Sequence, residues 1–134
     1  MNRRGLSAYK SVRKKTYGGM SQHALTMSIY KEIYKNLEVC NAAFVKKTNI
    51  GLAAFLNKKG VTLTKVVKCT TYMIDTADRS ADQETVQLYD RIYHYILDNA
   101  LIANKNIDHE AVKRALFMSK ELINIWDSIP ERYK

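Results

Sequence analysis

Apolar and polar residues follow a helical period over residues 80–129, and this stretch predicts two amphipathic helices joined by a polar turn at 104–108. The apolar positions recur at steps of three and four, which places them on one stripe of an α-helix. A capping-box pattern at Ser80 and Gln83 predicts the start of the first helix, and Asp108 is a suitable N-cap for the second. The stripes comprise Val86, Tyr89, Ile92, Tyr93, Ile96, Ala100 and Ala103, then Val112, Ala115, Leu116, Leu122, Ile123 and Trp126.

An earlier stretch with the same period predicts a long helix that begins after Ser21 and ends near Lys47. Its stripe consists of Leu25, Ile29, Ile33, Leu37, Cys40 and Phe44, and Tyr30 and Tyr34 widen the apolar face. Residues 50–57 form a second apolar patch, which either continues this helix or forms a short separate one. The run Lys58-Lys59-Gly60 predicts a helix end, because basic residues favour a helix C-terminus and glycine often follows it.

A further helix is predicted to open at Thr62 and to end in a turn over residues 75–82. Its stripe consists of Leu63, Val66, Val67, Thr70, Met73, Ile74 and Ala77. A strand over 61–67 would suit the β-branched residues there, but no partner strand is evident. Helix is therefore the preferred interpretation of this stretch.

Short polar connections between long helices favour antiparallel neighbours. The predicted fold class is all-α, an antiparallel up-and-down four-helix bundle with an extra short helix or an N-terminal capping segment. The bundle is expected over residues 21–129, with Trp126 as a core anchor and Pro130 ending the structured region. Residues 1–20 are expected to form a flexible basic N-terminal arm, and residues 130–134 a C-terminal tail.

Composition and charge narrow the class of protein. The chain has 134 residues, 46% of them apolar, and a formal net charge of +9, which attracts acidic partners. No run approaches the roughly 20 apolar residues of a membrane helix, and the basic N-terminus lacks the apolar region of a secretory signal. A cytoplasmic protein without a membrane span is the expectation.

The sequence contains no recognisable catalytic or cofactor-binding pattern. His23, His94 and His109 lie on different segments and do not form a zinc motif. Cys40 and Cys69 fit helical stripes and are expected to be buried thiols. No glycine-rich phosphate loop or nucleophile elbow occurs. We therefore expect a protein that is not an enzyme and has no catalytic residues, cofactor, metal or small-molecule substrate.

Tyrosine is abundant, with nine residues in the chain. Several of them fall on or beside the helical stripes, among them Tyr30, Tyr34, Tyr89, Tyr93 and Tyr95. Tyrosine combines a large apolar ring with a polar tip and few rotatable bonds, which suits protein interfaces. The sequence therefore favours a groove between helices that accepts an amphipathic segment of a partner.

The order of several motifs resembles the family of bacterial flagellar secretion chaperones dedicated to flagellin. Ala8-Tyr9 precedes a polar arm, and Ser21, Leu25 and Tyr30 match the start of the family's first long helix. Leu88-Tyr89 leads to Ala103-Asn104, a turn with Asp108 follows, and the last helix closes on Trp126. The resemblance covers about residues 8–129. The chain departs from the family pattern in having Gln22 where a proline is usual and extra lysines in a long 46–60 segment.

This resemblance implies a helical bundle that binds the disordered C-terminal segment of flagellin, prevents premature polymerisation and assists type III export for filament assembly. It also implies engagement of a flagellar export gate component, and a role for Tyr9 as a plug over an apolar surface. A homodimer is left open. The residues expected to contact the partner are Tyr9, Ile29, Tyr30, Ile33, Tyr34, Tyr89, Ile92, Tyr93, Ile96 and Asn104.

The alternative is a small basic helical protein that binds nucleic acid. Its support is the net charge of +9 and the basic N-terminal arm. Against it, the positive residues do not lie on a predicted recognition helix with side chains suited to base edges.

Overall fold

The structure of the chain, a computed structural model, describes residues 21–80 and 82–129. These residues form helices α2 (Gln22–Val45), α3 (Lys47–Ile50), α4 (Leu52–Asp75), α5 (Gln83–Lys105) and α6 (His109–Asp127). Nothing in the described part of the chain is a strand. The N-terminal arm, including Tyr9, and the tail at 130–134 lie outside the described residues.

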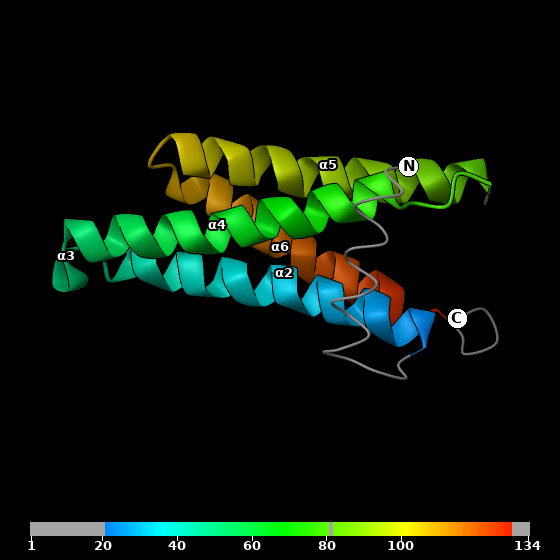
Figure 1. Ribbon diagram of the computed structural model, residues 1–134, viewed down its shortest axis with the longest axis horizontal. Coiled ribbons are helices and arrows are strands. Elements are labelled where there is room, and N and C mark those ends of the chain that lie inside the picture. The colour runs from blue at the N-terminus through cyan, green and yellow to red at the C-terminus, as the bar shows by residue number, and fades with distance from the viewer. Residues whose placement is uncertain (1–20, 81, 130–134) are drawn as a thin grey trace.

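The four long helices lie side by side as an antiparallel bundle, and α3 sits at one end, where α2 is linked to α4 (Figure 1). Each long helix packs on two neighbours, in the circular order α2, α4, α5 and α6. The pairs α2/α5 and α4/α6 are therefore diagonal. This arrangement confirms the predicted antiparallel four-helix bundle, and α3 is the extra short helix.

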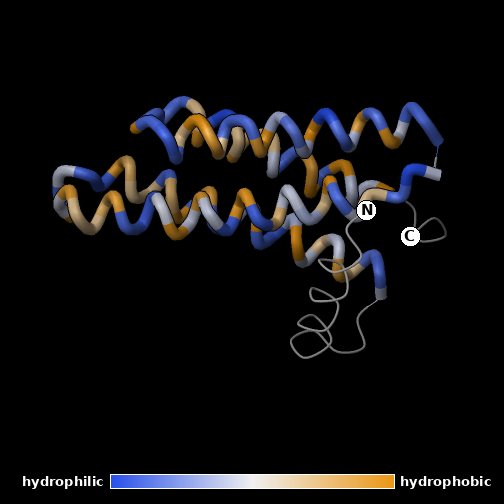
Figure 2. The backbone as a smooth tube through the Cα atoms, turned by 45° about the horizontal axis from the view of Figure 1, so that its top comes forward, coloured by the Kyte–Doolittle hydropathy of each residue, from blue (hydrophilic) through white to orange (hydrophobic). Residues whose placement is uncertain are grey.

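The apolar stripes of all four long helices meet in one core. Apolar and polar residues alternate along each helix in Figure 2, as helices with one buried face require. The largest apolar side chains that are almost wholly buried are Tyr30, Phe55, Ile33, Leu37, Leu63, Ile96, Leu122, Val66 and Val112. Small residues on α5 and α6, such as Ala100, Ala103, Ala111 and Ala115, are buried as well.

Side-chain caps fix the starts of three of the long helices. The Oγ of Ser21 accepts from the N–H of Ala24 at 3.1 Å, and a carboxylate oxygen of Asp108 accepts from the N–H of Ala111 at 3.1 Å. Both caps were predicted. The capping box at Ser80 and Gln83 was wrong, because α5 starts two residues later than expected and Asp82 is its N-cap, accepting from the N–H of Thr85 at 3.1 Å. A cap of this kind contributes about 1 kcal/mol.

The predicted helix end at Lys58-Lys59-Gly60 was also wrong, as was the predicted start at Thr62. Helix α4 begins at Leu52 and continues through Gly60 to Asp75, so residues 52–57 belong to it. A glycine inside a helix costs about 1 kcal/mol. Burying Phe55 upstream of that glycine contributes about 1.5–3 kcal/mol, which outweighs it. The hydroxyl of Thr62 donates to the carbonyl of Lys58 at 2.7 Å, within the helix.

Gly51 creates the break between α3 and α4. Its backbone has φ 88° and ψ 157°, a conformation that is nearly exclusive to glycine. The chain therefore ends α3 and starts α4 within a single residue. The first long helix ends at Val45, slightly earlier than the predicted Lys47, and α3 follows at once.

We expect opposite effects from replacing the two described glycines with alanine. Gly51→Ala should lower the free energy of unfolding by about 1–3 kcal/mol, because alanine cannot adopt this φ without strain. Gly60→Ala should raise it by about 0.5–1 kcal/mol, since an added Cβ meets no atom within 4 Å and the residue lies in a helix. Urea denaturation of both variants measures the difference, and equal effects of one sign would contradict the α3–α4 break.

Candidate partner-binding surface

Most of the residues predicted to bind a partner lie in the core. On α2 and α5, six are buried, namely Ile29, Tyr30, Ile33, Ile92, Tyr93 and Ile96. Tyr34 and Tyr89 are half-buried, and Asn104 is exposed. Tyr9 is outside the described residues. The structure thus brings the buried six together inside the bundle, and their direct contact with a partner stays a prediction.

An aromatic cluster connects three of the helices near the start of α2. The hydroxyls of Tyr30 on α2 and Tyr93 on α5 are hydrogen-bonded at 2.5 Å, and either can be the donor. The ring of Trp126 on α6 meets the rings of Tyr30 and Tyr89 edge-on, at centroid distances of 5.9 and 6.2 Å. Its Nε1 donates to the carbonyl of His23 at 3.2 Å. The cluster therefore buries polar tips with their partners and ties two diagonal helices together.

Burial also sets the ionisation of the two core tyrosines. It raises the pKa of Tyr30 and raises the pKa of Tyr93 to about 12. In an unfolded chain a tyrosine ionises near pH 10. Both phenols are therefore neutral at physiological pH, and their hydrogen bond joins two uncharged groups.

The bundle should lose stability in alkali because of this pair. A raised folded-state pKa means that the contribution is complete below about pH 10 and is lost as the pH rises toward about 12, by up to about 1.4 kcal/mol per group and pH unit. We expect the urea midpoint to fall between about pH 9 and about pH 11, and to fall less in a Tyr30→Phe/Tyr93→Phe variant. Equal falls in both proteins would contradict this origin of the effect.

A row of exposed apolar side chains follows one edge of α5. Leu88, Tyr95 and Ile102 are seven residues apart, which places them on one line along the helix. Asn99 lies on the same edge and is buried, and its Oδ1 accepts from Nε of Arg114 on α6 at 2.9 Å. The edge therefore faces α6.

Phe117 adds an aromatic ring from α6. It is 65% exposed and lies one turn after Arg114, on the outer surface of α6 opposite the buried stripe of that helix. We refer to Leu88, Tyr95, Ile102 and Phe117 as the α5–α6 seam. Exposed large apolar residues that gather along two neighbouring helices mark interaction sites.

Most of this seam was not predicted from the sequence. Tyr95 stood out only as one of many tyrosines, and Ile102 and Phe117 had no predicted role. The seven-residue spacing from Leu88 was the available signal, but the stronger period of the buried stripe hid it. Phe117 falls outside the apolar stripe of its helix, and this position indicated an exposed aromatic side chain.

The described residues contain no group of three histidine, cysteine or acidic side chains placed to hold a metal ion. Burial raises the pKa of the Cys40 thiol and raises that of Cys69 to about 11. Both cysteines are free thiols, Cys40 buried and Cys69 half-buried. Within the described ranges, no helix is both long and apolar enough to cross a membrane.

The fold is an all-α antiparallel bundle with exposed apolar residues on α5 and α6. The family model described as flagellar protein FliS matches residues 5–133, nearly the whole sequence. The chain belongs to the FliS family of flagellin export chaperones, which serve flagellar assembly and are not enzymes. No curated protein matches the chain at a significant level. Family membership thus supports the chaperone over the nucleic-acid-binding alternative.

Proposed function

We propose that this chaperone binds the disordered C-terminal segment of flagellin in the cytoplasm, as an amphipathic helix laid along the α5–α6 seam. The observation that carries the proposal is the exposed row Leu88, Tyr95 and Ile102 on α5, with Phe117 exposed on the neighbouring α6. Apolar anchors along adjoining helices are a recurrent way to hold a partner helix. A flagellin segment that is held on these anchors is not free to pair with other flagellin subunits.

Apolar burial on the seam offsets the ordering cost of the bound segment. Folding a disordered segment on binding loses about 2–5 kcal/mol of interaction energy to ordering. Apolar burial stabilises by about 25 cal/mol per Å², so roughly 100–200 Å² offsets that loss. Phe117, 65% exposed, supplies on the order of 100 Å² by itself. The three α5 side chains supply the remainder.

The buried residues predicted as partner contacts have a supporting part in this proposal. Tyr93, Ile92 and Ile96 pack on the inner face of α5 and hold that helix in place. The hydrogen bond between Tyr93 and Tyr30 fixes α5 against α2. A rigid α5 presents Leu88, Tyr95 and Ile102 in register and reduces the ordering needed on binding.

The test is co-purification with cognate flagellin and with flagellin that lacks its C-terminal segment. We expect binding to the complete protein and no binding to the truncated one. Equal retention of both flagellins, or of neither, would refute the proposal. Family resemblance further supports engagement of an export gate component by the loaded chaperone. Adding the soluble part of that component to the same assay tests whether it co-purifies with the chaperone and flagellin.

A matched pair of neighbouring substitutions tests the surface itself. Ile102→Ser should weaken flagellin binding about tenfold or more, because about 1.4 kcal/mol of apolar contact is lost. Leu101→Ser is the control, since Leu101 is similarly exposed, 47% against 41%, but lies about 100° away around α5. Titration of a labelled flagellin segment gives both affinities. Equal losses of affinity in the two variants would contradict binding at the α5–α6 seam.

A further inference from the structure

One end of the bundle carries exposed aliphatic side chains that the flagellin-binding surface does not use. Val45 ends α2, Ile50 ends α3, and Leu52 and Leu56 lie in the first turns of α4. Val45 is 68% and Leu52 63% exposed, and the other two are exposed as well. We refer to these four residues as the apolar tip. They surround the break at Gly51, where α3 forms the outermost point of this end (Figure 1).

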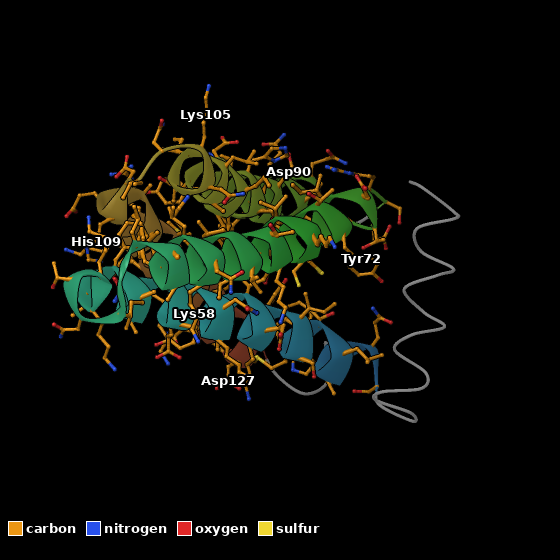
Figure 3. All side chains as sticks on the ribbon, turned by 60° about the vertical axis from the view of Figure 1, so that its left-hand side comes forward. Lys58, Tyr72, Asp90, Lys105, His109 and Asp127 are labelled. Carbon is orange, nitrogen blue, oxygen red and sulfur yellow. The ribbon has the colours of Figure 1, made fainter. Side chains whose placement is uncertain are left out.

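Positive charge surrounds the apolar tip. Lys46, Lys47 and Lys58 are exposed next to it, and the sequence has no Asp or Glu between Glu38 and Asp75. Figure 3 shows Lys58 on α4, the helix that leaves the tip. Farther along α4, Lys65 and Lys68 are exposed too. By contrast, α5 and α6 with their connection hold five basic and seven acidic residues, so the positive charge belongs to the α2–α4 side.

We propose that the apolar tip and its lysines dock on the anionic surface of a lipid bilayer. Aliphatic side chains on a protruding corner can enter the headgroup region while lysine ammonium groups stay at the phosphate level. Juxtaposed lysines without carboxylates are attracted by an anionic leaflet. This inference is independent of how flagellin binds, and it would bring the chaperone to the membrane across which its cargo is exported.

The residue types favour a bilayer over nucleic acid or an acidic protein. The segment from 39 to 74 has no arginine, the residue that binds nucleic-acid phosphates in bidentate fashion. Its exposed apolar residues at the tip are aliphatic, whereas single-stranded nucleic acid stacks on aromatic rings. An acidic partner helix would need a concave seat, and α3 instead projects at the end of the bundle (Figure 1).

Vesicle binding of the full chain tests the proposal. We expect sedimentation with mixed phosphatidylcholine–phosphatidylglycerol vesicles, little with phosphatidylcholine alone, and weaker binding as salt rises. Ile50→Ser/Leu52→Ser should lose at least tenfold in vesicle affinity and keep its flagellin affinity. Val45→Ser provides a second variant if that pair does not fold. Binding to neither kind of vesicle would overturn the proposal.

A matched pair of charge reversals distinguishes binding by the lysines at the apolar tip from attraction by the net charge of the protein. Lys46→Glu/Lys47→Glu should abolish binding to anionic vesicles, whereas Lys113→Glu/Lys120→Glu on α6 changes the total charge equally and should retain most of it. Equal losses in the two variants would show general attraction and overturn the assignment. Competition with duplex DNA gives a second check. The proposal would also be overturned if DNA displaced the vesicles and bound the wild type and the Ile50→Ser/Leu52→Ser variant equally.

Discussion

Replacing Phe55 with alanine should lower the free energy of unfolding by about 3–5 kcal/mol, the largest single effect we expect in the described bundle. The side chain is fully buried, and its ring meets that of Phe44 on α2 edge-on at 4.8 Å. Lys47 lies over the same ring at 5.6 Å from its centroid. Alanine removes these contacts and leaves a cavity between the end of α2 and the start of α4.

The neighbouring residue is the matched control for this prediction. Leu56 follows directly on α4 but is exposed, so Leu56→Ala should change stability by less than about 1 kcal/mol. Urea denaturation followed by circular dichroism gives both values. A small effect of Phe55→Ala would mean that the first turns of α4 do not pack on the bundle, as they would not if the helix began at Thr62.

Lys59→Met should lower the free energy of unfolding by about 2–4 kcal/mol, although it exchanges a charged side chain for an apolar one of similar length. Lys59 is buried, and its Nζ donates to the carbonyls of Ala103 at 3.0 Å and Asn104 at 2.8 Å. These carbonyls lie in the last turn of α5, beyond the last intrahelical bond from Asn106 to Ile102. Methionine leaves both without a donor and removes a positive charge from a helix C-terminus.

Lys58 offers the control because it is adjacent and exposed. Lys58→Met should leave the free energy of unfolding within about 0.5 kcal/mol of the wild type. Hydrogen exchange gives a second readout, since faster exchange in the last turns of α5 is expected only for Lys59→Met. Equal stability of the two variants would contradict the capping role of Lys59.

Lys59 lies where the sequence wrongly predicted a helix end. Lys58-Lys59-Gly60 has the composition of a helix end, and local chemistry favours that interpretation. The partner of Lys59 is 44 residues away on another helix, so no local pattern indicates it. Phe55 and Leu63 pack into the same core from either side of Gly60, and this tertiary packing outweighs the propensity of the glycine.

The candidate site, too, was predicted from the sequence only in part. Tyr30, Tyr93 and Trp126 were recognisable as important because large amphipathic rings fell on helical stripes. Whether they face a partner or the core depended on where the diagonal helix lay, and the structure puts both tyrosines inside. The α5–α6 seam was harder to predict, because which apolar residues of α5 and α6 stay exposed depends on how the two helices pack.

The sequence by itself determined the all-α class, the apolar stripes, the caps at Ser21 and Asp108 and the family, since each depends on residues close together in the chain or on their order. Tertiary structure alone decided that α4 runs through Gly60, that Lys59 caps α5, and which apolar residues remain exposed on the seam and at the tip. The physical reason is that burial and capping across helices depend on neighbours in space. Periodicity identifies an apolar face, but only packing shows what covers it.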